Sequence, residues 1–322
     1  MIVFLTANGH GFPVHTLVNG KLGAVTPEIR AATYDEMFKA RSIPAATYVF
    51  TGIDQLYDWE LKVAAELHRA LKAAGLRVLN DPARVMGRYA LLHTLHEEGI
   101  NPFDAYRADG RPRPRRFPVF LRREFDHKGP LTDLIADQPA LERALSEMQA
   151  AGEPLRGMLV VEFAGEPVAE GVWRKMGTFR IGDGYHVQNA VVEDHWVAKQ
   201  GTRGLADEAM YRDEAEAVTA NAVPEAVRRA FELSGIEWGR ADHTTVGGRD
   251  VIYEINTNPW VYRVRPQQSS TRDAVLKTAR ERMGRLLFAI DGGDGTPVAL
   301  TPGPRLEAYA NMNAGFVAPI RP

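Results

Sequence analysis

Charged and oxygen-bearing side chains interrupt two strand-like segments in the last third of the sequence. They are Arg240, Asp242, Glu254 and Asn256. Because side chains on a strand alternate between its two faces, Arg240 and Asp242 must share a face, and so must Glu254 and Asn256. The pair Gly247-Gly248 separates the two segments, so we predict a β-hairpin over residues 237–257.

The length of the turn decides whether the two pairs of side chains face each other. A two-residue turn would set Asp242 opposite Tyr253, whereas a three-residue turn that includes Arg249 would set it opposite Glu254. We predict the three-residue turn, which gathers all four side chains on one face. Three residues would then pack behind them: Ala241, Tyr253 and Ile255.

This set offers carboxylate and amide oxygens without any thiol, which suits a hard cation such as Mg²⁺. The alternative is a structural role, in which Asp242 pairs with Arg240 on a solvated sheet face while Asn256 and Asn258 are turn residues before Pro259. Each residue alone fits that alternative. The ordered set fits it poorly, so we favour a metal site.

The elements that must position the hairpin are those of an α/β protein. Near the N-terminus, apolar runs predict three strands, and leucines at helical spacing predict a helix with Asp54 as its N-cap and Gly75 as its C-cap. The strands are expected over 2–6, 47–51 and 76–79. This order predicts a small α/β domain that ends near Pro82.

The rest of the chain predicts a second α/β unit and then the elements around the hairpin. A helix begins at Pro82 and ends at Gly99, and the alternating prolines and arginines of 111–116 form a stiff linker. We then expect strands over 119–122 and 158–163, a helix over 140–150, antiparallel strands over 173–192 that turn at Gly182-Asp183-Gly184, helices near 207 and over 224–233, and a helix over 273–290. The segment after Asp291 and the proline-rich tail are expected to be loops.

Composition excludes several classes of function. The 322 residues are 45% hydrophobic and 25% charged, carry a formal net charge of -2 and contain no cysteine. Disulfides, thiolate zinc sites and cysteine nucleophiles are therefore excluded, and no global charge favours nucleic acid or a membrane surface. No segment approaches the about 20 apolar residues of a membrane span, and the short apolar start lacks the features of a secretory signal. We expect a cytoplasmic protein without a nucleic-acid or membrane partner.

The hairpin, with Arg-x-Asp on one strand and Glu-x-Asn-x-Asn-Pro on the other, resembles the terminal metal-binding motif of the ATP-grasp superfamily, to which D-alanine-D-alanine ligase and glutathione synthetase belong. The order of elements agrees over most of the chain. The resemblance implies a small N-terminal α/β domain and two lobes that clasp ATP between antiparallel sheets. The implied parts are an N-terminal domain over 1–82, a helix and linker over 83–116, a small lobe over 117–162, and a C-terminal lobe over 163–322 with the metal-binding hairpin and the C-terminal helix.

The resemblance also implies roles for single residues. Asp242, Glu254 and Asn256 would hold one or two Mg²⁺ ions that bridge the ATP phosphates, and Arg240 would stabilise the reacting oxyanion. Other positions match the elements that bind the nucleotide: Arg88 on a helix, Arg122 at the end of a strand, Lys128 in the loop over the phosphates, and Glu162 and Phe163 in the hinge that receives adenine. Arg88 and Arg122 stand where the family normally has lysine, and arginine keeps the charge but changes the geometry of the contact.

Further residues are candidates for contacts with phosphate or substrate. Arg174 and Lys175 follow the hinge and would act on phosphate or acyl phosphate, with an ordinary charged strand edge as the alternative. Lys199 is a weaker candidate of the same kind. Three residues beyond the hairpin would bind an anionic substrate group: Arg263, Arg265 and Ser270, the last near a helix N-terminus, where a capping role also explains it.

The activity implied by the resemblance is that of an ATP-dependent ligase, which joins a carboxylate to an amine through an acyl phosphate. Its partners would be a small-molecule or peptide carboxylate and an amine acceptor. Three alternatives stay open, namely a kinase on the same fold, a non-catalytic ATP-binding regulatory module, and an unrelated α/β scaffold. The identity of the acid and the acceptor is not predicted, nor is the oligomeric state, for which a homodimer is one option.

Overall fold

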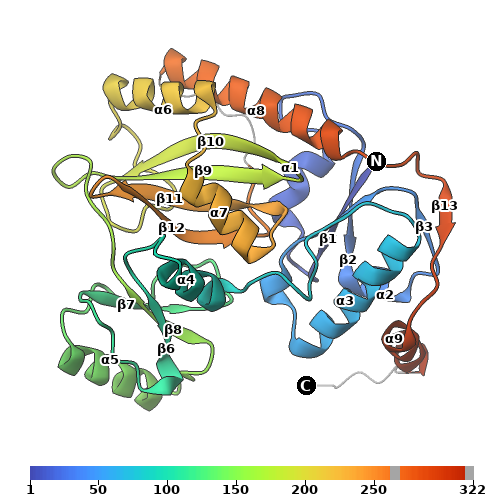
Figure 1. The fold of residues 1–322 in the computed structure, drawn as a ribbon, viewed down its shortest axis with the longest axis horizontal. Coiled ribbons are helices and arrows are strands. Elements are labelled where there is room, and N and C mark those ends of the chain that lie inside the picture. The colour runs from blue at the N-terminus through green and yellow to red at the C-terminus, as the bar shows by residue number, and fades with distance from the viewer. Residues whose placement is uncertain (262–268, 316–322) are drawn as a thin grey trace.

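The computed structural model describes residues 1–261 and 269–315, without the side chains of 313–315. Figure 1 shows three parts, which are an N-terminal domain, a small lobe built around α5, and a large lobe built around a four-stranded antiparallel sheet. The mixed α/β fold predicted from the sequence is confirmed.

The N-terminal domain is a parallel sheet in the order β2-β1-β4-β5. Its strands are Ile29–Thr33, Ile2–Thr6, Thr47–Phe50 and Val78–Leu79. All residues of β1 and β4 are buried, as expected for strands covered on both faces. Helices α2 (Tyr34–Lys39) and α3 (Asp58–Ala73) share the core on one face, and the end of α8 shares the core on the other.

The prediction that Asp54 caps the first long helix is wrong. A 3-10 turn, η2, occupies Ile53–Gln55, and α3 begins four residues after Asp54 with Tyr57 at its N-cap, where the Glu60 carboxylate accepts the Tyr57 N–H at 2.8 Å. The Asp54 carboxylate instead accepts a hydrogen bond from Gln55 Nε2 at 2.9 Å and lies 3.1 Å from His127 Nε2. The predicted C-terminal glycine is confirmed, because Gly75 adopts a φ of 78° just after the last turn.

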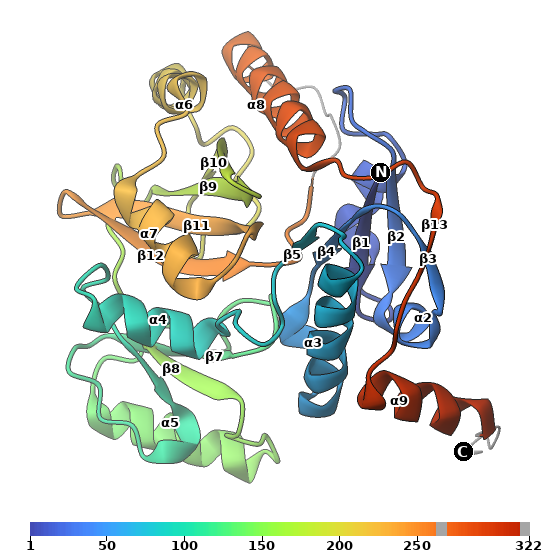
Figure 2. The ribbon, with the colours of Figure 1, turned by 45° about the vertical axis from the view of Figure 1, so that its right-hand side comes forward.

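The small lobe is an antiparallel sheet in the order β6-β8-β7, with one face packed on α5. Its elements are Ala105–Arg107, Met158–Glu162, Val119–Arg123 and the helix Gln138–Ala150. The preceding helix, α4 (Arg88–Glu97), begins six residues later than the predicted Pro82, because the Arg84 and Val85 N–H groups close a turn on the Asp81 carbonyl. Helix α4 lies between the small and the large lobe and contributes to both cores (Figure 2).

The large lobe is an antiparallel sheet in the order β10-β9-β11-β12. Its strands are Gly184–Glu193, Trp173–Ile181, Trp238–Val246 and Arg249–Asn256, and its helices are α6 (Glu208–Ala220), α7 (Glu225–Ser234) and α8 (Ser270–Ile290). The predicted strand pair over 173–192 and its turn are confirmed as β9 and β10. Helices α6 and α7 share cores with strand residues on the sheet face opposite Asp242, and the end of α8 packs on Phe179, Ile181 and Trp238, so α6 and α7 leave the face with the charged residues available.

The prediction that the tail after Asp291 consists of loops is wrong in part, because the tail contains a strand and a helix. The tail also does not stay with the large lobe. It returns to the N-terminal domain, where β13 (Pro297–Ala299) pairs with β3 (Ser42–Pro44) and α9 (Pro304–Gly315) lies against α2 and α3 (Figure 2). Its apolar residues Leu300 and Leu306 are buried in the N-terminal core. Within the described ranges, no helix is long and apolar enough to cross a membrane.

Candidate active site

The β11–β12 hairpin places Asp242 directly opposite Glu254 and Arg240 opposite Asn256, as predicted. The predicted reason is wrong. Val246 pairs with Arg249, so the turn contains only Gly247 and Gly248, and the offset comes instead from a β-bulge at Tyr253 between the Asp242 and His243 pairs. A bulge sets two residues of one strand against one of the other and redirects their side chains.

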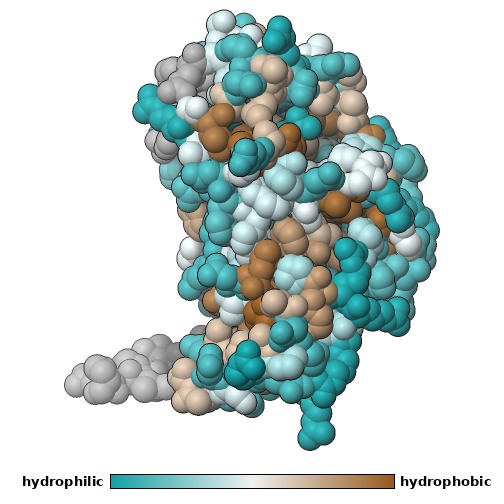
Figure 3. Space-filling model, turned by 90° about the vertical axis from the view of Figure 1, so that its left-hand side faces the viewer, coloured by the Kyte–Doolittle hydropathy of each residue, from teal (hydrophilic) through white to brown (hydrophobic). Residues whose placement is uncertain are grey.

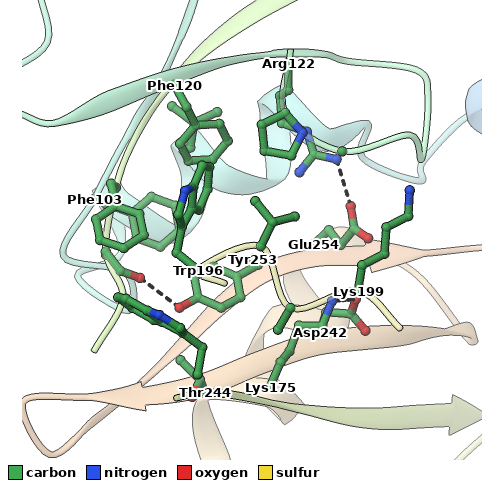
Figure 4. A pocket seen from close by; sticks show the side chains of 18 of the residues that line it. Phe103, Phe120, Arg122, Lys175, Trp196, Lys199, Asp242, Thr244, Tyr253 and Glu254 are labelled. Carbon is green, nitrogen blue, oxygen red and sulfur yellow. Dashed lines mark hydrogen bonds and ion pairs between the residues drawn. The ribbon is translucent and has the colours of Figure 1, made fainter. Parts of the chain in front are cut away.

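The bulge also overturns the prediction that Tyr253 packs behind the sheet. Both Tyr253 and Glu254 line the same pocket, and the Tyr253 hydroxyl donates to the Ala164 carbonyl at 2.8 Å (Figure 4). The extra residue, Tyr253, therefore connects β12 to the segment that follows β8 through a hydrogen bond.

Glu254 is held by two arginines from different parts of the chain. Its Oε2 lies 2.7 Å from Arg88 Nη2 on α4 and 3.2 Å from Arg122 Nη2 at the end of β7. Burial raises the pKa of Glu254, but Arg88 and Arg122 outweigh burial and hold this pKa well below its usual value. Glu254 is therefore a carboxylate at neutral pH.

Asp242 has a corresponding pair of cations on its own sheet. Lys175 Nζ on β9 lies 2.9 Å from Asp242 Oδ2, and Arg240 Nε lies 3.0 Å from Asp242 Oδ1. Burial raises the pKa of Asp242, and Arg240 and Lys175 outweigh it, so the pKa is lowered. Gly177 pairs with Asp242 across the strands, and a Cβ there would lie 3.3 Å from Arg240 Cδ, so the glycine leaves room for the arginine to lie over the sheet.

Two of these ion pairs, Arg122–Glu254 and Lys175–Asp242, line one end of a cleft between the two antiparallel sheets (Figure 4). The cleft holds about 970 Å³ of space free of protein atoms, its open mouth included. Its charged end contains Arg122, Lys175, Lys199, Asp242 and Glu254. Its other end is aromatic and is lined by Phe103, Phe120, Phe163, Trp173 and Trp196. The small and the large lobe meet on the face shown in Figure 3, where hydrophobic residues gather in the middle between hydrophilic areas.

The segment after β10 that contains Trp196 and Lys199 contacts both lobes, and for Trp196 the sequence analysis predicts no role. The Trp196 ring lies 5.1 Å from that of Phe120 on β7 and 5.5 Å from that of Phe163. Lys199 Nζ, from the same segment, donates to the Lys128 carbonyl at 2.7 Å. The Glu193 carboxylate shapes the segment by accepting the N–H groups of residues 199, 200 and 201. A tryptophan directly after the polar run Glu193-Asp194-His195 was the available signal in the sequence.

Both predicted hinge residues, Glu162 and Phe163, lie at the cleft. Phe163 lines the cleft, but the Glu162 carboxylate accepts four hydrogen bonds from its own lobe, namely from the N–H groups of Asp104, Arg115 and Arg116 and from the Tyr106 hydroxyl. It is 1% exposed. The carboxylate thus holds the loop after β6, and only the main chain of this segment is left to receive a base.

Other predicted residues lie at or outside the rim of the cleft. Arg174 lines the cleft and lies 3.4 Å from the Asp213 carboxylate. Arg88, Lys128, Arg240 and Asn256 lie near the charged end but do not line it. Asn256 Oδ1 accepts the Asn258 N–H at 2.7 Å. Ser270 begins α8 away from the cleft, and its neighbour Ser269 is the N-cap. Arg263 and Arg265 lie outside the described residues.

The oxygen donors at the charged end are suitable for Mg²⁺ in kind. Two carboxylates face each other across the hairpin with an amide next to them, and both carboxylates are ionised. In the part of the chain that the structure describes, no group of three or more His, Cys, Asp or Glu residues could hold a metal. A cation here would therefore need oxygens from a bound phosphate, as is usual for Mg²⁺.

Comparison with solved structures identifies the fold. D-alanine-D-alanine ligase from Bacillus anthracis, complexed with ATP, superposes with a TM-score of 0.50 at 11% identity over 90% of this chain and 95% of that chain. The chain has the ATP-grasp fold. No family model matches the sequence, and no curated protein matches it.

Two further ATP-grasp structures are similar at lower TM-scores. An L-amino acid ligase from Bacillus licheniformis matches with a TM-score of 0.43 at 12% identity, over 87% of this chain and 74% of that chain. D-cycloserine synthetase DcsG matches with a TM-score of 0.46 at 14% identity, over 88% of this chain and 99% of that chain.

Proposed function

We propose that this ATP-grasp protein is a Mg²⁺-dependent ligase that uses ATP to join a carboxylate to an amine through an acyl phosphate. The observation that carries the proposal is the cleft between the two antiparallel sheets, which has an aromatic end and an end with ionised Asp242 and Glu254 among basic side chains. The similar ligase from Bacillus anthracis is a complex with ATP.

The aromatic end suits a nucleobase and the basic end suits phosphates. Phe120, Phe163 and Trp196 offer ring faces and edges to a planar base. Arg122, Lys175 and Lys199 would bind phosphate oxygens. The Arg122 Nε atom is buried and has no hydrogen-bond partner among the described residues, so it keeps one donor available for a ligand.

Charge pairing makes ATP and Mg²⁺ depend on each other. A nucleotide alone would draw Arg122 and Lys175 toward its phosphates and leave the buried Glu254 and Asp242 carboxylates unpaired, which is costly. Mg²⁺ held by these carboxylates and Asn256 would neutralise them and supply charge to the phosphates. The basic side chains are then free to bind the phosphates, so each ligand favours the other.

In the reaction, a carboxylate oxygen of the acid attacks the γ-phosphorus, the bond to ADP breaks, and the amine then displaces phosphate from the acyl phosphate. Positioning and charge supply the catalysis, since no side-chain nucleophile is needed. Arg122 and Lys175 would orient the phosphoryl group, with Arg174 at the rim. Arg240, held on the sheet by Asp242, would stabilise the tetrahedral oxyanion. Arg263 and Arg265 are proposed for the substrate's anionic group.

Calorimetry with ATP, with and without Mg²⁺, followed by a screen for ADP release over amino acids and other carboxylic acids, tests the proposal. Asp242→Asn should abolish release, while Asp250→Asn, at the turn end of the same hairpin, should leave it unchanged. ATP binding without release for any acid would favour a non-catalytic regulatory module. A stable phosphorylated product without an amide would favour a kinase. Absence of binding in the wild type would refute the assignment of ATP.

A further inference from the structure

The loop after β7, residues 124–128, is contacted by every part of the molecule. From the N-terminal domain, Gln55 Nε2 donates to the Phe125 carbonyl at 2.6 Å. From α4, Arg88 Nη1 donates to the carbonyls of residues 123, 124 and 126. From the large lobe, Lys199 Nζ donates to the Lys128 carbonyl. The loop is thus the point at which three parts of the chain meet beside the charged end of the cleft.

His127 is the residue of this loop that both lines the cleft and contacts the N-terminal domain. Its Nε2 lies 3.1 Å from Asp54 Oδ2, and its Nδ1 lies 3.4 Å from Arg88 Nη2. The same Arg88 nitrogen lies 2.7 Å from Glu254. A continuous path of polar contacts therefore runs from Asp54 through His127 and Arg88 to the carboxylate proposed to bind Mg²⁺.

The turn that contains Asp54 also contacts the residues that follow β12 in the β11–β12 hairpin. Gly52 has a φ of 58°, in the left-handed region that favours glycine, and a Cβ there would lie 3.7 Å from both Cβ and Nδ2 of Asn258. Asn258 follows Asn256 by two residues and donates to the His10 carbonyl at 2.9 Å. Residues 52–55 of the N-terminal domain therefore lie against both loop 124–128 and Asn258, which follows β12.

We propose that His127 is a positioning residue that couples the nucleotide cleft to the N-terminal domain. Asp54 holds the imidazole, and the imidazole keeps loop 124–128 and Arg88 in place at the phosphate end. Breaking the contact on the Asp54 side should weaken nucleotide binding about as much as removing the imidazole, although Asp54 itself lies outside the cleft. The inference rests on the proposed function only in that the ligand is ATP.

The test is a double-mutant cycle with Asp54→Asn, His127→Gln and both together. Titration calorimetry gives the Kd for ATP in the presence of Mg²⁺, and a thermal melt gives the unfolding midpoint. Each single substitution should raise the Kd by about fivefold to tenfold, and the double substitution should raise it no more than the larger single effect. If Asp54 and His127 contribute only to stability, the substitutions should lower the midpoint of thermal unfolding without this non-additive change in Kd.

A second His–Asp pair supplies the control. His93 Nδ1 lies 2.9 Å from Asp104 Oδ1, and this pair joins α4 to the small lobe without contacting the N-terminal domain. His93→Gln should therefore leave the Kd unchanged. An unchanged Kd in Asp54→Asn, or additive effects in the double variant, would overturn the proposal, because His127 would then act on the ligand without the N-terminal domain.

Hydrogen exchange separates this inference from the proposed function, because it requires no ligand. Amides of residues 124–131 should exchange faster in Asp54→Asn than in the wild type, while the strands of the large lobe stay unchanged. If the wild type binds no ATP, the proposed function fails, and faster exchange still supports the contact while unchanged exchange refutes it. If a variant melts before the titration, Gln55→Ala replaces it, because Gln55 anchors the same loop through the Phe125 carbonyl.

Discussion

The buried Arg88 and the half-buried Glu254 form an ion pair of 2.7 Å across the boundary between α4 and β12. Arg122 contacts the same carboxylate from the small lobe. One carboxylate thus holds two guanidinium groups near the charged end of the cleft. Any ligand that takes over the carboxylate changes what these arginines can bind.

Glu254→Gln should therefore separate the effects of Mg²⁺ and ATP. The amide no longer holds Arg88 and Arg122 by charge, so ATP without Mg²⁺ should bind at least as tightly as it binds the wild type without Mg²⁺. The gain on adding Mg²⁺ should fall by about tenfold or more, because a metal ligand is lost. Calorimetry in EDTA and in Mg²⁺ measures both terms. If the gain survives in the variant, Glu254 is not a metal ligand.

The Asp54–His127 pair predicts a pH-dependent contribution to stability. Burial lowers the pKa of His127, but the hydrogen bond that it donates to Asp54 and the negative charges of Glu254 and Asp54 together outweigh burial, so this pKa is raised above its ordinary 6.5. Burial raises the pKa of Asp54, and the contact with His127 outweighs it and lowers this pKa below 3.8. The stabilisation from the ionised Asp54 carboxylate is fully present above the ordinary pKa of Asp and is lost as pH falls through the lowered pKa of Asp54. The stabilisation from the protonated His127 ring is fully present below the ordinary pKa of His and is lost as pH rises through the raised pKa of His127.

The stability difference between the wild type and Asp54→Asn should accordingly be largest between about pH 4 and pH 6.5 and should shrink in the alkaline range. Because the His127 side chain is 35% exposed, screening keeps the effect small. Urea unfolding at pH 6 and pH 9 measures the difference, and NMR titration of the His127 ring should show a lower pKa in the variant. A difference that grows with pH would contradict this assignment of charges.

The register of the hairpin was predictable, but its cause was not. The period of two puts Arg240 with Asp242 and Glu254 with Asn256, and the ordered set of charged residues favours the register in which Asp242 and Glu254 face each other. A bulge at Tyr253 and a longer turn both satisfy the same requirement. The choice depends on the contact of the Tyr253 hydroxyl with the Ala164 carbonyl, which is remote in sequence.

The contacts between the domains could also not be predicted from the sequence. Asp54 looked like an N-cap because it precedes a helical pattern, yet its partner is 73 residues away. The tail looked like loop because glycine and proline are frequent there, yet its leucines complete the N-terminal core. Local patterns indicate which residues form an element, whereas partners across the chain depend on packing that no local period encodes.

Asn80 should be a critical residue for the joint between the N-terminal domain and the large lobe. It is fully buried with a φ of 65°, its Nδ2 donates to the Phe50 and Trp238 carbonyls, and its Oδ1 accepts the N–H groups of Glu237 and Trp238. Asn80→Ala would remove its hydrogen bonds with four main-chain groups, three of which are buried. We expect a loss of about 3 kcal/mol or more in urea unfolding. Asn19→Ala removes one exposed hydrogen bond and should change stability by less than about 0.5 kcal/mol.

Glu66 should hold the C-terminal helix on the N-terminal domain. Its Oε1 accepts the Arg305 and Leu306 N–H groups at 2.9 Å each, so a carboxylate on α3 caps the start of α9. Gly303 makes the approach possible, because a Cβ there would lie 2.5 Å from the Glu66 carboxyl carbon. Side-chain caps and charged hydrogen bonds of this kind contribute about 1–3 kcal/mol.

Glu66→Ala should release α9 before the rest of the protein unfolds, because the helix would lose its cap while the large lobe loses nothing. Limited proteolysis should then cut near residues 300–304 several times faster than in the wild type. Glu66→Gln keeps an acceptor oxygen and should show a smaller increase. Glu307→Ala, in the exposed first turn of α9, is the matched control and should leave the rate unchanged. Equal cleavage of Glu66→Ala and the wild type would mean that packing of Leu306 and Tyr309 holds the helix without the cap.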